Sequence, residues 1–508
     1  MTEARKRLVL VAAILGTTVV TIDATVVNVA LPAIEDDLGG GLAGQQWTSN
    51  AYLVLLGSLL LVGGSLGDLF GERRVFAAGV AGFGGTSLFC ALAPTIELLV
   101  VARALQGVAG ALLTPAALAV IVTAFPPDER GRAVGAWTAW GGIGTVLGPL
   151  IGGQLVDAAS WRWIFAINVP VVIATLVLVA RAVPAGRARP ADARVDVVGA
   201  ALCALGLAGM TFGVIEQPLH GWGDARVALP LLAGALMFAG FLVWEAKSDH
   251  PMLPLSLFRR RNFAIGNVET FSMYAGLGLL FFLLVLFLQQ VAGYSALAAG
   301  TASLPVTLVM FALSTRFGML ADRHGPRFFM GVGPLVAALG LAWFLRLDSD
   351  VDYLVDLLPG LLVFALGLTM TVAPLTATVL ADADEENAGI ASGVNNAIAR
   401  VAGLAAIAVI GVIAGSGAQE LGPDQASIDA FRMGVGLATA LVALGGVLGL
   451  VGIVNPRRDV QASECPGGQF VGVTQEAARQ SPCEWQRQAA ACSLRDSRDV
   501  DVELTAHG

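Results

Sequence analysis

The stretch GSLGDLFGERR (residues 64–74) returns later in the chain as GMLADRHGPR (318–327). Both copies follow the pattern G-x-L-[GA]-D-x-x-G-x-R, and their glycines allow a tight turn between two helices. Asp68 and Asp322 have side chains that cap helix starts or pair with nearby arginines. Two copies of one polar loop, each lying between long apolar runs, predict a chain built from an internal repeat.

The apolar runs on either side of these loops are long. The chain has 508 residues, of which 56% are hydrophobic and 13% charged, and its mean hydropathy is +0.75. This composition excludes the ordinary soluble classes. An apolar run of about 18 residues or more is long enough to cross a membrane. We therefore expect an all-α polytopic membrane protein with fourteen transmembrane helices, near residues 8–32, 46–66, 75–94, 97–124, 133–157, 163–183, 196–216, 226–245, 263–291, 297–320, 327–346, 354–381, 388–415 and 430–454.

The positive charges predict the orientation and the domain limits. With the N-terminus inside the cell, most arginines and lysines fall in cytoplasmic segments, as the positive-inside rule requires. The repeated loops then follow the second and tenth helices, which gives six helices, an inserted pair and six more. The predicted domains are an N-terminal six-helix bundle (1–183), a linker with two extra helices (184–262), a C-terminal six-helix bundle (263–454) and a disordered cytoplasmic tail (455–508).

Several function classes lack their sequence signatures. The chain has no G-x-x-x-x-G-K, no H-E-x-x-H and no clustered His/Cys set, so we expect no enzyme, no ATP use, no cofactor and no metal. Its five cysteines form no C-x-x-C pair. The net charge of −8 comes from scattered acids, and no basic patch with interleaved aromatics predicts nucleic-acid binding.

Four motifs fall in the first five predicted helices and their loops. They are DATVVNVALP (23–32) in the first helix, GSLGDLFGERR (64–74) in the loop after the second, RALQGVAGALLTPAAL (103–118) in the fourth helix and GGIGTVLGPLIGG (141–153) in the fifth. In this order they resemble the major facilitator superfamily, and within it the fourteen-helix branch of drug/proton antiporters. The resemblance covers residues 8–454 and implies two six-helix bundles plus two extra central helices. It also implies export by alternating access. The second half departs from the pattern, because its helix GLTMTVAPLTATVL has no arginine that matches Arg103.

Proton coupling requires a group whose proton affinity changes between states. The four histidines fall in predicted loops or in the tail, so we expect a carboxylic relay. Asp23 in the first helix and Glu269 in the ninth are acids inside apolar runs, where charge is costly. We interpret Asp23 as the proton carrier and Arg103 as its modulator, with a structural hydrogen bond between helices as the alternative. Glu269 is interpreted as a second coupling residue that carries a proton, binds a cationic group or pairs with Arg400.

Polar side chains on the same helices predict a substrate cavity. On the first helix, Thr18, Thr21, Thr25 and Asn28 form one stripe, and Asp23 points roughly opposite to it. We expect one of these two faces to pack against another helix and the other to open to the cavity. The predicted cavity residues are Asp23, Thr25, Asn28, Gln106, Glu269, Tyr274, Asn395 and Arg400.

Glycines and turn residues predict the parts that move. In the fifth helix, small residues four apart allow close helix contact and a proline adds a kink, although ordinary packing explains the glycines almost as well. The predicted gating residues of this helix are Gly144, Gly148, Pro149 and Gly152. Those of the two loops are Gly64, Asp68, Gly71, Arg73, Arg74, Gly318, Asp322, Gly325 and Arg327.

These features predict a proton-coupled antiporter that exports lipophilic small molecules, cationic ones included, as in multidrug efflux. A dedicated exporter of one endogenous metabolite, amino acid or lipid is the alternative within transport, and a membrane sensor or enzyme is the alternative outside it. The expected partners are a small-molecule substrate, protons and the lipid bilayer. We expect a monomer in the inner or plasma membrane of a bacterium, with both termini cytoplasmic.

Overall fold

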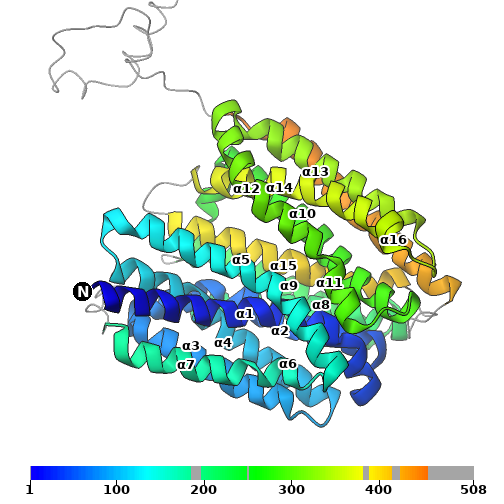
Figure 1. Ribbon diagram of the computed structural model, residues 1–508, viewed down its shortest axis with the longest axis horizontal. Helices are drawn as coiled ribbons and strands as arrows, with labels where there is room; N and C mark the ends of the chain where they lie inside the picture. Colours follow the sequence, from blue (N-terminus) through cyan, green and yellow to red (C-terminus); the bar gives the residue numbers. More distant parts are fainter. Residues whose placement is uncertain (1, 185–195, 249–250, 382–387, 415–423, 456–508) are drawn as a thin grey trace, which may run out of the picture. The chain divides into compact units, whose positions relative to one another are not determined.

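The computed structural model describes residues 2–184, 196–248, 251–381, 388–414 and 424–455, and long helices account for most of them (Figure 1). The predicted tail lies almost entirely outside the described residues. The long helices are α1 (Glu3–Leu38), α2 (Gly41–Phe70), α3 (Glu72–Ala91), α4 (Ile96–Ala124), α5 (Pro127–Ala158), α7 (Asn168–Ala182), α8 (Val197–His220), α9 (Ala225–Lys247), α10 (Arg261–Leu286), α12 (Leu304–His324), α13 (Pro326–Trp343), α14 (Leu358–Ala381), α15 (Ala388–Ala414) and α16 (Gln425–Gly452). Shorter segments are α6 (Trp163–Ala166), α11 (Ala296–Ala302) and the turns η1 (Leu255–Arg259), η2 (Phe287–Val291), η3 (Phe344–Arg346) and η4 (Tyr353–Leu357).

Twelve helical segments of the described residues are long and apolar enough to cross a membrane. Five of them join neighbouring elements, because the pairs α6 and α7, α10 and η2, α11 and α12, α13 and η3, and η4 and α14 each count as one segment. Helices α2 and α5, which cover the ranges predicted at 46–66 and 133–157, have 30 and 32 residues but are not among the twelve. The structure therefore supports a polytopic helical membrane protein, and the number of fourteen crossings stays a prediction.

Helices α1 to α7 share an apolar core. Helix α2 packs along α4, α3 packs along α4 and α7, and α1 packs along α5. Large side chains such as Phe76 and Phe83 fill the space between them and are fully buried. Where α2 crosses α4, a side chain at Gly63 would collide with the carbonyl oxygen of Ala111, so only glycine permits this close approach.

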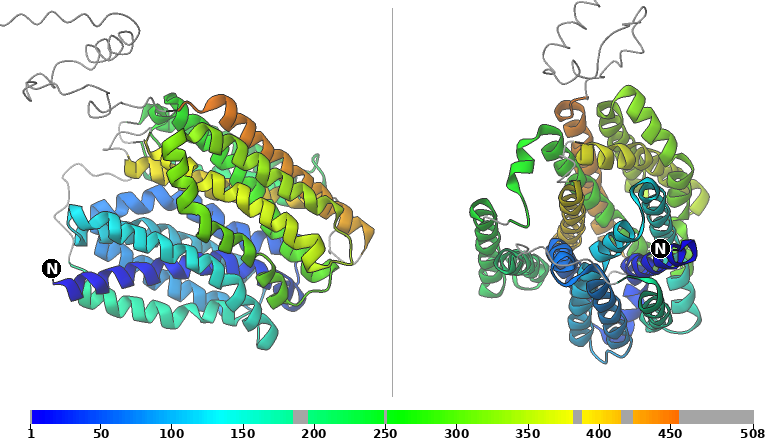
Figure 2. Two further views of the ribbon diagram at one scale, coloured as in Figure 1. Left: turned by 45° about the horizontal axis from the view of Figure 1, so that its top comes forward. Right: turned by 90° about the vertical axis from the view of Figure 1, so that its left-hand side faces the viewer.

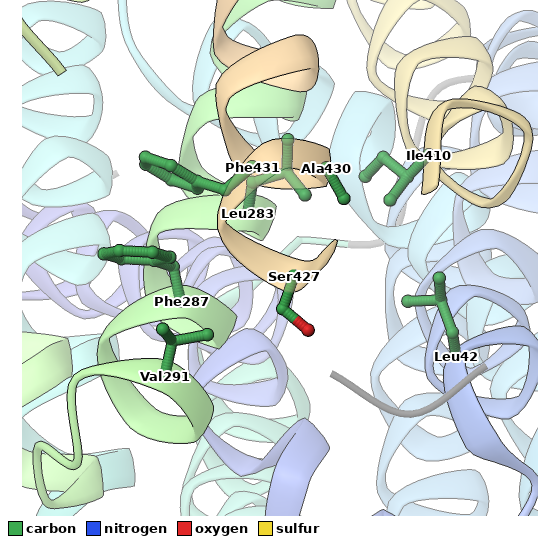
Figure 3. A pocket seen from close by; sticks show the side chains of 8 residues that line it. All are labelled: Leu42, Leu283, Phe287, Val291, Ile410, Ser427, Ala430 and Phe431. Carbon is green, nitrogen blue, oxygen red and sulfur yellow. The ribbon is translucent and has the colours of Figure 1, made fainter. Parts of the chain in front are cut away.

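Helices α10 to α16 pack in a comparable way. Helix α10 lies against α14, α15 and α16, and α13 lies between α14 and α16. Near the ends of α10 and η2, the rings of Phe287 and Phe431 stack with centroids 4.1 Å apart. A cavity of only about 10 Å³ lies beside them, between Leu42 of α2 and Ser427 of α16 (Figure 3). Such a volume holds about one water molecule at most, so the side chains around Phe287 and Phe431 are closely packed.

Helices α8 and α9 form a hairpin that packs on α2 and α15 (Figure 2). The two helices of the hairpin touch through glycines, since a side chain at Gly209 would meet the backbone of Pro230 and Gly234. The hairpin meets the other helices through apolar side chains, among them Leu207 on α8 and Leu404 on α15. This pair therefore attaches to both halves of the chain.

Hydrogen bonds join the two halves at one end of the helices, which the charge pattern predicts to be the outer end. Gln46 Nε2 donates to the carbonyl of Ile407 at 2.6 Å, and Gln289 Nε2 donates to the carbonyl of Val29 at 3.1 Å. The carboxylate of Asp157 accepts from the backbone of the α11 turn, at 2.9 Å from Leu297 N. These bonds hold α1, α2 and α5 against η2, α11 and α15.

The repeated loops lie at the opposite end and have matching geometry. Gly71 and Gly325 join α2 to α3 and α12 to α13, with φ of +90° and +89°. Both are left-handed conformations that favour glycine, so the predicted turn is confirmed at these positions. Each arginine donates to a carbonyl of its own half: Arg73 to that of Ala180 at 3.1 Å, and Arg327 to that of Leu450 at 2.6 Å. The side chains of Asp68 and Asp322 lie outside the described residues.

Candidate proton-coupling site

Asp23 lies in α1 at the centre of a buried polar network. Its carboxylate accepts from Arg103 Nη1 at 2.5 Å, from Gln106 Nε2 at 2.9 Å and from Asn168 Nδ2 at 3.3 Å. Asp23 is 0% and Arg103 1% exposed. Both carboxylate oxygens are therefore satisfied, and the negative charge has a positive partner in direct contact. The predicted pairing of Asp23 with Arg103 is present in the structure.

Arg103 is held by several contacts besides Asp23. Its Nε donates to the carbonyl of Thr48 on α2 at 3.0 Å, and its Nη1 also donates to Gln106 Oε1 at 2.6 Å. The guanidinium lies over the Tyr52 ring, 4.4 Å from the centroid, and 5.7 Å from that of Phe165. Aromatic faces attract a desolvated cation, so these rings add to the stabilisation of the buried guanidinium.

Four members of this environment were missed by the sequence analysis. Ser87 Oγ on α3 accepts from Gln106 Nε2 at 2.9 Å and from Asn168 Nδ2 at 3.2 Å. Asn168, Tyr52 and Thr48 complete the set. Their common signal is a polar group within an otherwise apolar run, which is the same signal that identified Asp23. That signal does not identify the partner of each group, because three different helices, α2, α3 and α7, supply them.

The threonine face of α1 packs against α5. Side chains added at Gly144 and Gly148 would meet Thr21 and the Thr25 hydroxyl. Thr25 Oγ1 donates to carbonyls of its own helix, at 3.0 Å from Ile22 O, and Asn28 Oδ1 accepts from Ser49 Oγ at 3.5 Å. The expectation that one face packs on a neighbouring helix is confirmed for this stripe.

The expectation that the opposite face opens to a cavity is wrong in this conformation. Asp23 and Gln106 are both fully buried, because α3, α4 and α7 supply side chains that surround the carboxylate. In α5, the other gating candidates also make close contacts. Gly152 meets Val26, and the carbonyl of Pro149 meets Gly300 of α11. Neither glycine leaves room for an added methyl group.

Glu269 makes no hydrogen bond to the network around Asp23. It is fully buried in α10, and neither carboxyl oxygen has a hydrogen-bond partner within the described residues. The side chain occupies a notch in α16, where atoms added at Gly449 and Gly445 would lie 3.0 Å from Oε2 and 3.7 Å from Cγ. In this structure Glu269 contacts α16 and makes no ion pair with Arg400, whereas its roles in coupling and in substrate binding stay predictions.

The remaining predicted cavity residues lie on α10 and α15. Asn395 Nδ2 donates to Asn267 Oδ1 at 3.2 Å and to Thr270 Oγ1 at 2.7 Å, which links the two helices. Tyr274 and Arg400 are partly buried. Arg400 makes no ion pair or hydrogen bond with the described part of the chain, and its Cβ would lie 3.3 Å from an atom added at Gly57 of α2.

A cavity of about 460 Å³ lies beside α15, and Arg400 is not among its lining residues. Its lining comes from α2, α8, α9, α10, α15 and the segment before α10, and the exposed surface is almost entirely apolar. Gly57, Phe271 and Val401 are among the lining residues. The volume falls in the range of sites for drug-sized molecules, about 300–1,000 Å³.

The gating candidates of the two loops occupy matching places as well. An atom added at Gly64 would lie 3.9 Å from Pro115 of α4, and one added at Gly318 would lie 3.8 Å from Ala373 of α14. Arg74 is exposed. No group of three or more His, Cys, Asp or Glu residues that is able to hold a metal occurs among the described residues.

Known proteins resemble this chain in sequence and in fold. The tetracenomycin C resistance and export protein of Streptomyces glaucescens is 36% identical over 417 residues, which are 82% of this chain and 77% of that protein. The cephamycin export protein CmcT of Amycolatopsis lactamdurans is 37% identical over 431 residues, 84% of this chain and 88% of that protein. The multidrug resistance protein Stp of Mycobacterium tuberculosis is 32% identical over 461 residues, 89% of this chain and 84% of that protein.

Solved structures of transporters share the fold at low sequence identity. A bacterial homologue of the human lysosomal transporter Spinster, inward-facing and unoccupied, has a TM-score of 0.65 at 16% identity and covers 89% of this chain and 98% of its own. The xylose transporter XylE of E. coli, inward-open, has a TM-score of 0.57 at 14% identity and covers 89% and 97%. The sequence model of the Major Facilitator Superfamily matches residues 13–407. With that match and these relatives, the chain belongs to the Major Facilitator Superfamily.

Proposed function

We propose that this protein is a proton-coupled antiporter that exports lipophilic small molecules by alternating access. Export of antibiotics and other drugs is the function that the relatives support, because their names describe antibiotic export and multidrug resistance. The observation that carries the coupling is the buried Asp23–Arg103 ion pair. An opposite charge in contact with a carboxyl group changes its affinity for protons, so a change in this contact would bind or release a proton.

Asp23 and Arg103 form a switch in this proposal. A proton on Asp23 cancels the charge that attracts Arg103, so the guanidinium shifts toward Gln106, Tyr52 and the carbonyl of Thr48, which already contact it. Helices α1 and α4, which carry the pair, also pack against α5 and α2. Loss of the ion pair would therefore alter the packing of helices that form the contacts between the two halves.

The conformation described here fits an inward-open stage of the cycle. Bonds such as Gln46 to Ile407 and Gln289 to Val29 close the predicted outer end between the halves. At the other end, Arg73 and Arg327 donate to carbonyls of their own halves. We propose that protonation of Asp23 from outside and its deprotonation toward the cytoplasm drive the exchange of the two states.

We also propose that the chain belongs to the fourteen-helix branch. Helices α2 and α5 add two long helices to the twelve apolar segments, and each packs along helices that are among those twelve. The α8–α9 hairpin would then be the inserted pair between two bundles of six. The matching turns at Gly71 and Gly325 support this division.

A dedicated exporter of one metabolite is the second candidate. It is favoured by the relatives that are named after a single antibiotic, such as tetracenomycin C or cephamycin. The two candidates differ in the breadth of the substrate range and share the same coupling site.

The test uses the full chain reconstituted into vesicles that contain a pH-sensitive dye. After a pH gradient is imposed, puromycin, rhodamine 123 and fluorescein are added separately, and proton flux is measured. We expect at least one compound to drive proton flux in the wild type and in Asp36→Asn, an exposed acid of the same helix. Asp23→Asn is expected to abolish coupling. Transport without proton flux, or coupling that survives Asp23→Asn, would overturn the proposed mechanism.

A further inference from the structure

We propose that the cavity beside α15 is a lipid site, which holds one acyl chain of an anionic phospholipid. The headgroup of this lipid lies at the end of the helices that is predicted to face the cytoplasm. We call this space the lateral cavity, and its wall combines α2, α8, α9, α10, α15 and the segment before α10. The site is separate from Asp23 and Arg103, so the inference goes beyond the proposed export function.

The chemistry of the wall favours a hydrocarbon chain over a drug. Sites for drug-sized molecules carry a few polar groups that fix the orientation of the ligand. Among the described lining residues, hydroxyl and thiol groups come from Ser58, Thr211 and Cys203, and none of the lining residues is charged. The Ser58 hydroxyl already donates to the carbonyl of Val54 in its own helix at 2.6 Å. A hydrocarbon chain needs no polar partner and therefore suits this wall.

The lateral cavity is elongated along the helices. Its lining residues on α15 run from Val394 to Val409, which corresponds to about 22 Å at 1.5 Å per residue. The hydrocarbon of one leaflet is about 15 Å deep, since the whole core is ~30 Å thick. Val394 lies near the start of α15 and packs in the same apolar cluster as Leu253 and Phe258. A chain that enters at this end therefore has room to extend through a whole leaflet.

The lateral cavity also lies beside surface that faces lipid. The α8–α9 hairpin covers one side of it, and α9 exposes large apolar side chains such as Leu232 and Leu236, at 60% and 73%. Phe271 of α10 lines the cavity and is itself 39% exposed. Bilayer hydrocarbon thus has access to the wall. An empty apolar cavity forfeits the dispersion contacts that a chain makes, and such contacts drive packing within a membrane.

Exposed positive charge flanks the end that is predicted to face the cytoplasm. Phe258 lines the cavity, and the next residue, Arg259, is exposed. Lys247 in the last turn of α9 is exposed as well, and Glu245 of that turn accepts from the backbone of the lining residue Leu253 at 2.9 Å. Neither cation makes an ion pair with the described part of the chain.

These cations and the apolar wall match the two parts of an anionic lipid. Basic residues at the cytoplasmic surface attract anionic headgroups. The headgroup remains at the membrane surface, outside the lateral cavity, while the acyl chain fills the space between α2, α15 and the hairpin. The wall comes from both halves of the chain and from the hairpin, so one bound chain contacts all three parts.

The experiment uses the full-length protein in phosphatidylcholine vesicles with a trace of phosphatidylglycerol that carries a photoreactive diazirine near the end of one acyl chain. After illumination, mass spectrometry identifies the labelled residues, and phosphatidylcholine with the same reactive chain is the lipid control. Ala405→Phe places a ring in the cavity wall. Ala235→Phe, on the exposed side of α9, is its matched control.

We expect the chain to label the deep end of the lateral cavity, at Val214 and Val409. Ala405→Phe should remove most of this label, and Ala235→Phe should keep it. Label confined to residues outside the cavity, or label that is unchanged in Ala405→Phe, would overturn the inference. Displacement of the wild-type label by puromycin or rhodamine 123 would assign the cavity to cargo and would overturn it as well.

A second pair of variants tests the headgroup and leaves the core of the protein unchanged. In the wild type, phosphatidylglycerol should label the cavity at least about fivefold more than phosphatidylcholine. The double variant Lys247→Gln, Arg259→Gln should bring the two lipids close to equal labelling. The control Arg7→Gln, Arg316→Gln removes two other exposed charges and should keep the preference. Equal labelling by the two lipids in the wild type would contradict the anionic headgroup.

Discussion

Asp23 and Glu269 are two fully buried carboxyl groups with opposite surroundings. Asp23 has an arginine, a glutamine and an asparagine as donors, supplied by α4 and α7. Glu269 has no donor among the described residues and touches two glycines of α16. The comparison shows that burial alone does not define the role of an acid in a membrane helix.

The difference determines which form of each group the fold tolerates. A buried carboxylate without a partner is too costly to keep, so the neutral acid is the form that fits the notch around Glu269. The network around Asp23 accommodates the ionised form and supplies several fixed dipoles besides Arg103. A group that is stable in its charged form in one state, and loses its partner in another, is suited to carry a proton through a cycle.

The largest predicted effect comes from removing one partner of the buried pair. Arg103→Met leaves the Asp23 carboxylate without its cation, and we expect a loss of about 3–5 kcal/mol in the free energy of unfolding. Thermal unfolding of the purified protein in detergent measures this loss. The double variant Asp23→Asn, Arg103→Met should recover part of it, because no charge is then left unpaired.

The control for this variant is Arg162→Met, which breaks the partly exposed ion pair of Arg162 with Asp37 near the end of the same helix α1. Exposed pairs contribute about 0–1 kcal/mol, so this change should cost far less. Equal losses in the two arginine variants would contradict the contrast between a buried and an exposed pair.

An intermediate effect is predicted for the notch around Glu269. Gly449→Ala places a methyl group 3.0 Å from Glu269 Oε2 and against the carbonyl of Met330, so overpacking should cost about 1–3 kcal/mol. The control Gly403→Ala lies in the transmembrane helix α15 and meets nothing within 4 Å. Detergent unfolding curves of the two alanine variants test the difference, and similar stabilities would show that the notch is not tightly packed.

The smallest effect is expected for Glu269→Gln. Glutamine has nearly the same shape as the neutral acid, so the free energy of unfolding should change by about 1 kcal/mol or less. Asp23→Asn removes a charge-assisted bond and should cost more, about 1.5–3 kcal/mol. Unfolding at neutral pH compares the two. A larger loss for Glu269→Gln would mean that an ionised Glu269 has a partner in the membrane protein.

Much of the fold follows from local features of the sequence. Long apolar runs predict helices regardless of tertiary context, and the glycines of the repeated loops predict the turns that Gly71 and Gly325 form. The Asp23–Arg103 pair was also predictable, because very few ionisable residues lie inside the runs and a buried charge there is costly without a partner.

The neighbours of each acid were not predictable. Ser87 and Asn168 reach Asp23 only because α3 and α7 pack beside α1 and α4. The side of α10 that bears Glu269 faces α16, and this depends on glycines about 180 residues away in the chain. A helical projection gives the angle between side chains on one helix and contains no information about which helix lies opposite.

Proton release on substrate binding is the measurement that tests Asp23 most directly. The purified protein is placed in weakly buffered detergent solution, and the compound that the wild type exports is added while pH is recorded. We predict proton release from the wild type and from Glu269→Gln, and none from Asp23→Asn. Release that persists in Asp23→Asn and disappears in Glu269→Gln would assign the proton to the other acid and contradict the account.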